Sequence, residues 1–306
     1  MIFRVLRPEE LELFVAHCAA VFSHASADYF RNHQQDDPNR ESGAVFIAED
    51  AGRIVASVCV FAREIYIRGQ PVRVGGIGDV ATVEAYRRQG LSAALLKMAI
   101  EHMNANDMPV SLLFTGRHDH YGRQGWFSVC KRRTIIDLRS LSDLPARCSL
   151  YPLTPPDFGE AMELYQTSAR RLDGTLVRNP AYWERWVPHS QKNPVALKDD
   201  NDIMLAWMDV DFLEDKKAIV LTDYASQAET EWLLPMMNLF AQTRPAYAYA
   251  AVPAPLLPHL NGPYVEENFS MFRLNRPFAL HGTQIDTAGK LAAALSDSVY
   301  WQTDVF

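Results

Sequence analysis

The chain has 306 residues, of which 48% are apolar and 22% charged, and its formal net charge is −7. The length suffices for two ordinary hydrophobic cores, and the negative charge disfavours nucleic acid and anionic membranes as partners. No segment approaches the roughly 20 consecutive apolar residues of a membrane span, and the N-terminus lacks the apolar stretch of a secretory signal, so we expect a cytoplasmic protein.

The first 140 residues alternate strand and helix signals. Pro8 opens a helix, Ser26 is a favourable N-cap for a second one, and turns at Gly52 and Gly69 separate three extended segments that predict an antiparallel meander. In chain order, the predicted elements are a strand at 2–6, helices at 8–22 and 26–35, strands at 44–50, 53–67 and 71–85, a helix from 90 to 105, a strand at 110–116, a short helix at 119–125 and a strand at 126–138.

The helix after Gly90 carries a single apolar stripe, so we expect it to cover one face of the sheet. The residues of that stripe are Leu91, Ala94, Leu95, Met98 and His102. The near-continuous apolar run at 110–116 is typical of a strand buried on both faces, and a helical crossover would make it parallel to the strand before the helix.

The second half repeats this order weakly, from about residue 141. Its predicted elements are strands at 148–153, 195–210 (with a turn at 198–202), 216–225, 246–252 and 268–274, and helices at 156–172 and 228–242. The second half therefore looks like a degenerate copy of the first, and we set the boundary between two domains, 1–140 and 141–306, with an uncertainty of about ten residues.

A cationic turn precedes the helix at residue 91. Arg87 and Arg88 stand before Gly90, where the first amides of a helix lack intrahelical partners and the helix dipole adds positive charge. Such an end can bind phosphate oxygens, and the two guanidinium groups would strengthen the site. No Gly-Lys-Ser/Thr follows, which disfavours a triphosphate loop. A solvated cationic loop before a surface helix is the alternative.

Residues 44–130 resemble the GNAT superfamily of CoA-dependent N-acyltransferases. The family's diphosphate turn reads Gln/Arg-x-x-Gly-x-Gly/Ala, and Arg87 and Gly90 match it, whereas Ser92 departs from it. A second family motif, Tyr-x-x-x-Gly-Phe/Trp, is matched by Tyr121 and by the Gly-Trp pair at 125–126. The resemblance implies an α/β (α+β) fold of two tandem GNAT-like domains, each a mixed, mostly antiparallel sheet flanked by helices, the second degenerate.

The resemblance also implies a binding site for acetyl-CoA as co-substrate. The strand before the turn would pair its backbone with the pantetheine arm, and the thioester would lie where the strands before and after the helix splay apart. The implied cofactor-binding residues are Ala81, Thr82, Val83, Arg87, Arg88, Gln89, Gly90, Leu91 and Ser92.

Three groups are candidates for proton transfer. Tyr121 could protonate the departing thiolate, because a phenol stays protonated at neutral pH; the alternative is that its ring only packs on the sheet. Asp79 could accept the proton of the amine, although an aspartate beside Gly78 is as often a bulge residue. The tandem arrangement resembles Eis-type acetyltransferases, which implies the C-terminal carboxylate of Phe306 as another candidate base; an ordinary apolar tail is the alternative.

Metal chemistry is not expected. The four cysteines are scattered without CxxC pairing, which predicts reduced and mostly buried thiols, and Asp119 of the His-Asp-His run at 118–120 suits a helix cap better than a metal site. Aromatic residues at Tyr182, Trp183 and Trp186 favour core or interdomain packing, with a cation-binding wall as the alternative.

The favoured function is an N-acetyltransferase that acts on a primary amine of a small molecule or peptide. A non-catalytic acyl-CoA sensor is the second hypothesis. The third is a dinucleotide-binding oxidoreductase, because the run from Gly76 to Ala81 fits Gly-x-Gly-x-x-Ala, although its β-branched residues favour a strand there. A homo-oligomer is possible.

Overall fold

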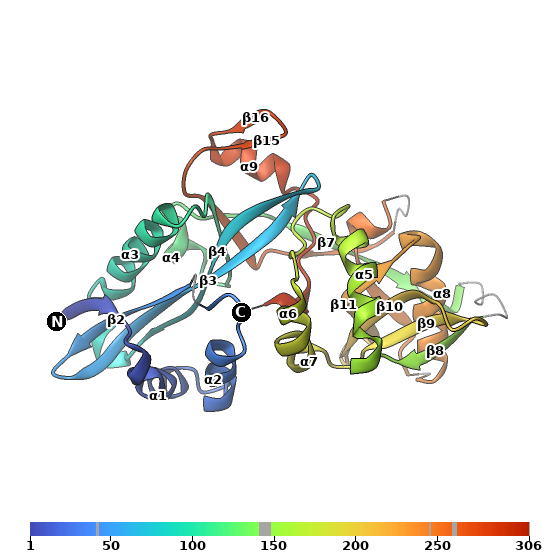
Figure 1. Cartoon of the computed structure of the whole chain (residues 1–306), viewed down its shortest axis with the longest axis horizontal. Coiled ribbons are helices and arrows are strands. Elements are labelled where there is room, and N and C mark those ends of the chain that lie inside the picture. Colours follow the sequence, from blue (N-terminus) through green and yellow to red (C-terminus); the bar gives the residue numbers. More distant parts are fainter. Residues whose placement is uncertain (41–42, 141–147, 245, 259–261, 306) are drawn as a thin grey trace.

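The computed structural model describes residues 1–40, 43–140, 148–244, 246–258 and 262–305. These residues form two mixed sheets of seven strands each, with helices against both (Figure 1). The α+β fold class with two similar halves is thereby confirmed.

The first sheet contains, in spatial order, β1 (Ile2–Val5), β2 (Ala44–Asp50), β3 (Arg53–Ile67), β4 (Gln70–Thr82), β5 (Val110–Phe114), β14 (Ser270–Leu274) and β6 (Phe127–Ser128). The second contains β8 (Cys148–Pro152), β9 (Val195–Asp199), β10 (Met204–Leu213), β11 (Ala218–Ser226), β12 (Tyr249–Pro253), β7 (Lys131–Asp137) and β13 (Tyr264–Glu267). The helices are α1 (Leu11–Val21), α2 (Ala27–Gln35), α3 (Leu91–Ala105), α4 (His118–Gly122), α5 (Phe158–Ala169), α6 (Pro180–Arg185), α7 (Val187–Ser190), α8 (Glu229–Gln242) and α9 (Ala288–Ala294), and a hairpin joins β15 (Phe278–Leu280) to β16 (Thr283–Ile285).

Both halves share one connection that matters for the site. In the first, β4 leads through α3 into β5, which lies parallel to β4; in the second, β11 leads through α8 into β12, which lies parallel to β11. The preceding strands, β2 to β4 and β9 to β11, form antiparallel meanders. The second half is therefore a structural repeat of the first, as its order of elements predicts.

The two sheets exchange one strand each. The predicted strand at 126–138 is wrong as a single element, because the chain leaves the first sheet after β6 and pairs as β7 with β12 and β13 of the second. Conversely, β14 comes from the second half of the chain and lies between β5 and β6. An alternating pattern specifies which face of a strand is buried but not which sheet receives it. The boundary at residue 140 stays a prediction, and a cut there does not separate the sheets.

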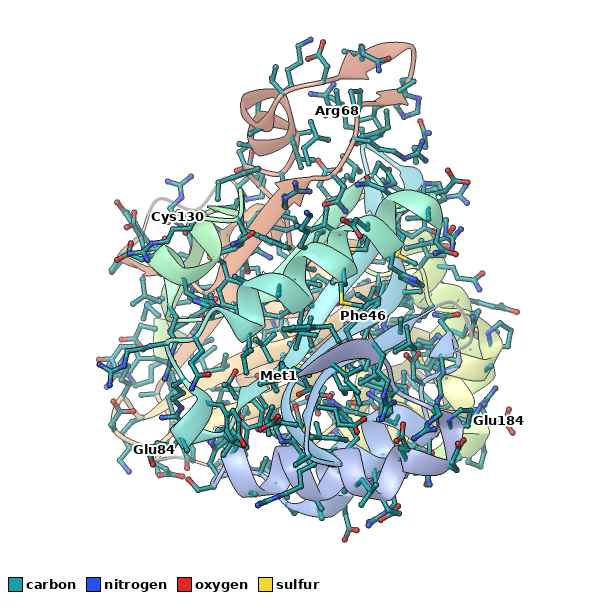
Figure 2. All side chains as sticks on the ribbon, turned by 90° about the vertical axis from the view of Figure 1, so that its left-hand side faces the viewer. Met1, Phe46, Arg68, Glu84, Cys130 and Glu184 are labelled. Carbon is teal, nitrogen blue, oxygen red and sulfur yellow. The ribbon has the colours of Figure 1, made fainter. Side chains whose placement is uncertain are left out.

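Helix α3 lies across the first sheet, over Phe46 (Figure 2). Leu91 and Leu95 are buried as predicted, but Ala94, Met98 and His102 are only half-buried. The buried face runs instead through Leu91, Leu95, Leu96, Ala99 and Met103. Met103 on this face packs on a glycine of β4, because a Cβ at Gly75 would lie only 2.1 Å from the Met103 sulfur.

The same glycine-rich segment excludes the dinucleotide hypothesis. Gly76 and Gly78 lie in the extended strand β4, which continues to Thr82, and α3 begins only at Leu91. A dinucleotide fingerprint requires a tight turn and a helix N-terminus within the glycine run. Of the glycines in this run, Gly75 makes room for Met103 of α3.

The two halves meet through aromatic side chains of α6 and its neighbour α7. Tyr182, Trp183 and Trp186 are at most 4% exposed, which confirms the packing interpretation. The guanidinium of Arg63, on β3, lies 5.7 Å from the Tyr182 ring and 5.2 Å from the Trp186 ring. The cation that these rings meet is thus a residue of the chain itself.

Cys18 and Cys59 are buried, but Cys130 is exposed and Cys148 is half-buried, so burial holds for only part of the predicted set. Across the described ranges, no helix is long and apolar enough to cross a membrane.

Candidate active site

The strands β4 and β5 diverge beside the N-terminus of α3. They pair only from Val74 to Gly76 on β4, and beyond Gly76 a pocket of about 1680 Å³ opens between them. The remainder of β4, the turn before α3, the segment after β5 and the junction of α1 with α2 all line this pocket. The gap leaves one edge of β4 without a neighbouring strand, so its backbone can pair with an extended ligand.

The turn before α3 has the geometry of an anion site. Gly90 is the N-cap of α3 with φ of +81°, and Arg88 has φ of +63°. No side chain caps the helix, and nothing lies within 4 Å of the position that a Cβ of Gly90 would occupy. The first amides of α3 therefore face open space at the positive end of the helix dipole. Glycine is required here for its backbone conformation.

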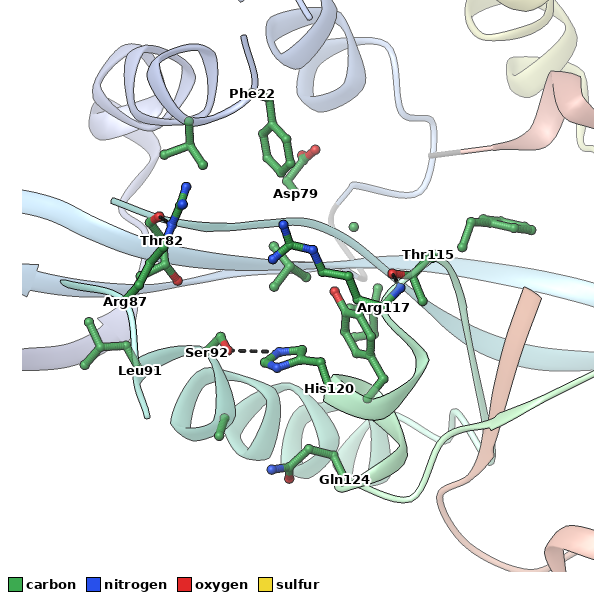
Figure 3. A pocket seen from close by; sticks show the side chains of 18 of the residues that line it. Phe22, Asp79, Thr82, Arg87, Leu91, Ser92, Thr115, Arg117, His120 and Gln124 are labelled. Atoms are coloured by element: carbon green, nitrogen blue, oxygen red, sulfur yellow. Dashed lines mark hydrogen bonds between the residues drawn. The ribbon is translucent and has the colours of Figure 1, made fainter. Parts of the chain in front are cut away.

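The predicted cofactor-binding residues divide into two groups. Thr82, Arg87, Arg88, Gly90, Leu91 and Ser92 line the pocket. The others are not among the lining residues: Ala81 is buried in the core, the Val83 amide donates to the Val55 carbonyl oxygen at 3.0 Å, and the exposed Gln89 side chain donates to the Ala85 carbonyl oxygen at 3.3 Å. Arg87 and Arg88 are both exposed, and Arg87 points toward Thr82 (Figure 3).

Tyr121 lines the pocket from α4. Its ring packs edge-on against His120, at 4.9 Å between centroids, and against Trp126, at 6.2 Å. Burial raises the pKa of the phenol to about 12, while the nearby Arg117 opposes the shift. Tyr121 is therefore protonated at neutral pH and can donate a proton, but it is a weaker acid than an exposed tyrosine.

Asp79 lies in a β-bulge of β4. The pairing of β3 with β4 slips between Ser57 and Cys59, and Asp79 has φ of +48°. The Ser57 hydroxyl donates to the Asp79 carbonyl oxygen at 2.9 Å, which fixes the bulge. Asp79 lines the pocket from this bulge, so the bulge and the site interpretations are compatible.

The Asp79 carboxyl group titrates close to neutral pH. Burial raises its pKa to about 6, against hydrogen bonds from Cys59 and Gln34. Its Oδ2 atom is buried and has no hydrogen-bond partner among the described residues. A carboxylate with such a pKa can accept a proton from an amine at neutral pH.

Comparison with known proteins identifies the fold that carries this pocket. Residues 3–129 match the family model described as an acetyltransferase (GNAT) domain. Residues 3–129 therefore carry a GNAT acetyltransferase domain. No curated protein matches the sequence of the chain.

Several solved structures resemble the chain over both halves. A probable N-acyltransferase from Enterococcus faecalis has 11% identity and a TM-score of 0.72, with 90% of this chain and 75% of that chain covered. A GCN5-related N-acetyltransferase from Anabaena variabilis has 17% identity and a TM-score of 0.70, with coverage of 92% and 76%. Eis1 from Mycobacterium abscessus has 15% identity and a TM-score of 0.65, with coverage of 90% and 74%. Likeness at these identities shows the fold.

The departure from the GNAT turn at Ser92 has a structural partner. The Ser92 hydroxyl lies 3.1 Å from the Nε2 atom of His120, so the side chain bonds across to α4 (Figure 3). Burial, Arg117 and Arg123 lower the pKa of His120, which favours the neutral imidazole. The Ser92 side chain therefore links the N-terminus of α3 to α4, the helix that carries Tyr121.

The helix cap predicted at Asp119, in the His-Asp-His run at 118–120, is wrong. Arg117, and not Asp119, is the N-cap residue of α4, and Asp119 lies in its first turn. His118 bonds through Nε2 to the Asn268 carbonyl oxygen at 2.6 Å, whereas His120 faces Ser92. The two imidazoles thus serve different contacts.

Phe306, the third candidate for proton transfer, lies outside the described residues. The segment before it is buried, and Tyr300 packs against Phe114 of the pocket wall at 5.0 Å between ring centroids. The terminal segment thus supports the GNAT pocket from behind, and the role of the Phe306 carboxylate stays a prediction.

Sequence reasoning missed the part of the GNAT pocket built by α1, α2 and the start of α4. Phe22, Tyr29 and Arg117 line the pocket together with Asp79. Arg117 could have been found from its position one helical turn before Tyr121. The two aromatic residues gave no signal, because apolar residues on short helices usually indicate core packing.

Proposed function

We propose that the protein is an acetyl-CoA-dependent N-acetyltransferase that acts on a primary amine. A single observation carries this proposal: the turn before α3, the open edge of β4, Tyr121 and Asp79 all line one pocket. A GNAT acyltransferase needs an acyl-CoA. The proposal adds that the acyl group is acetyl and that the acceptor is a primary amine.

The reaction divides among these groups. The diphosphate of the co-substrate binds the amides of α3 with Arg87 and Arg88, and the pantetheine arm follows β4 into the gap. Asp79 takes the proton of the ammonium group, directly or through water, and the neutral amine attacks the thioester carbonyl carbon. The C–S bond then breaks, Tyr121 protonates the departing thiolate, and the second proton lost by the attacking nitrogen passes through water to restore the Tyr121 phenol. The Phe306 carboxylate is the alternative base.

The test is release of free thiol by the full-length protein with acetyl-CoA and a panel of primary amines. Turnover that depends on the amine supports the proposal. Tight binding of acetyl-CoA without turnover on any amine supports an acyl-CoA sensor instead. The raised pKa of Tyr121 favours this second candidate, because it makes proton donation harder. Absence of binding contradicts both.

Replacing Tyr121 by phenylalanine is expected to lower kcat by about 100-fold, the usual scale of general acid catalysis. The dissociation constant of acetyl-CoA should change little, because the ring still packs on Trp126. Steady-state thiol release and calorimetric titration measure the two quantities. Tyr151→Phe removes the hydroxyl of an exposed tyrosine on β8 and is the control. A Tyr121→Phe enzyme with the control's kcat would remove the acid role.

A further inference from the structure

One end of the pocket is an aromatic wall made by the junction of α1 and α2. Phe22 follows the last residue of α1, and the Ala25 amide donates to its carbonyl oxygen at 3.1 Å, which closes a tight turn. Ser26 caps α2 by accepting a hydrogen bond from the Tyr29 amide. The Phe22 and Phe30 rings stack at 5.6 Å, and Tyr29 meets Phe30 edge-on at 5.1 Å. The turn at Phe22 and the Ser26 cap of α2 hold the three rings in one wall.

This wall adjoins the candidate base. Figure 3 shows the Phe22 ring next to the Asp79 carboxyl group, and both residues line the pocket with Tyr29 and Phe30. The Asp79 charge also contributes to the raised pKa of Tyr29, although burial contributes more. The rest of an amine that donates its proton to Asp79 can therefore lie along these rings.

The charges around the pocket restrict how many cationic groups an acceptor can carry. Asp79 is the one acidic residue among the described residues that line the pocket. The basic residues there are Arg87, Arg88, Arg117, Arg123, His24 and His120. Arg117 and His120 belong to the α4 side, across from Asp79 (Figure 3). With the diphosphate of acetyl-CoA on Arg87 and Arg88, a second ammonium group would face Arg117 and Arg123, whose like charge disfavours it.

We propose that the acceptor is an arylalkylamine: one ammonium group facing Asp79, joined by a short linker to a flat apolar ring that packs on Phe22, Tyr29 and Phe30. Aromatic rings attract a further ring edge-on or offset and also attract the adjoining cation, so the wall recognises both parts of such a molecule. This inference rests on the proposed function, since it names the substrate of the same pocket.

The first test compares three amines of similar length in the thiol-release assay with the full chain: 2-phenylethylamine, n-hexylamine and 1,5-diaminopentane. The expected kcat/KM falls in that order, by about 10-fold for loss of the ring and about 100-fold for a second charge. A diamine used as well as 2-phenylethylamine overturns this inference and leaves the N-acetyltransferase intact. No turnover with any of the three, or with a wider amine panel, overturns the proposed function and this inference together.

Variants of the wall give a second, independent test. Tyr29 is 43% exposed and Tyr151, on the other sheet, is 48% exposed, so Tyr29→Ala and Tyr151→Ala are a matched pair that should both fold. Tyr29→Ala, and separately Phe22→Leu, should lower kcat/KM for 2-phenylethylamine about 10-fold and for n-hexylamine less than 3-fold. The acetyl-CoA dissociation constant should stay at the wild-type value in all three variants. An equal loss for both amines would contradict ring recognition.

Discussion

Replacing Asp79 by asparagine is expected to lower kcat at least 100-fold and to leave acetyl-CoA binding unchanged. The amide has the shape of the carboxyl group but cannot take a proton from the amine. In the wild-type enzyme, kcat/KM should fall below about pH 6, where the Asp79 carboxyl group becomes protonated. Stopped-time thiol release across pH 5–8 measures both effects. Asp119→Asn, an exposed carboxylate on α4, is the control.

The same variant should be more stable than the wild type at neutral pH. The folded state raises the Asp79 pKa to about 6 from an ordinary value of 3.8, so the fold disfavours the ionised form. As the pH rises from 4 to 6, the unfolded chain loses this proton first and the wild type loses stability. Asparagine carries no such penalty. We expect Asp79→Asn to gain roughly 1–2 kcal/mol in free energy of unfolding at pH 8 and less at pH 4.5.

Two outcomes would contradict this account of Asp79. A rate equal to that of Asp119→Asn would move the base elsewhere, and the Phe306 carboxylate would become the first candidate. A loss of activity accompanied by lower stability at pH 8 would mean that Asp79 stabilises the β-bulge of β4 and does not act as the base. Urea unfolding at the two pH values separates these cases from the expected one.

Replacing Arg178 by methionine is expected to destabilise the fold by about 3–5 kcal/mol, the cost of leaving buried carboxylates without their cation. The Arg178 guanidinium is fully buried and bonds to Asp304 at 2.8 and 3.0 Å and to Asp223 on β11 at 2.7 Å. It also stacks on the Tyr165 ring at 4.0 Å. Methionine keeps the packing volume and removes all three charge-assisted hydrogen bonds.

Arg139→Met is the matched control, because Arg139 pairs with Asp137 at 2.6 Å but is 65% exposed. Exposed pairs contribute about 0–1 kcal/mol. Urea unfolding of both variants measures the difference. Equal and small changes would show that the buried cluster does not fasten the terminal segment, which carries Asp304 and, through Tyr300, supports Phe114 of the pocket.

Local signals located many elements of the fold closely. The strand expected at 53–67 is β3, because turns with a glycine bound it at both ends. The Ser26 cap of α2 is also correct. The exchanged strands β7 and β14 were assigned to the wrong sheets, since their partners lie far away in the sequence. The buried face of α3 includes Met103, which packs on Gly75, a residue 28 positions away in the chain, and a local pattern does not reveal such a contact.

The candidate site likewise contains residues that local sequence patterns identify and residues that only the packing brings together. The turn at Arg87 and the tyrosine at 121 belong to motifs with a fixed spacing, so the sequence alone identifies them. In the structure, both line one pocket. The aromatic wall and Arg117 belong to no motif. Their role arises because α1, α2 and α4 lie around the gap between β4 and β5, and that arrangement is decided by packing rather than by local pattern.

The most direct test of the account is a calorimetric titration of acetyl-CoA into the wild type and into the double variant Arg87→Ala/Arg88→Ala. The central claim is that the N-terminus of α3 and these two guanidinium groups bind the diphosphate. The double variant should raise the dissociation constant by about 10- to 100-fold, as expected for lost charge-assisted hydrogen bonds. Arg132→Ala/Arg139→Ala removes the same charge from exposed positions away from the pocket and should bind like the wild type. An unchanged dissociation constant in the Arg87/Arg88 variant would contradict the claim.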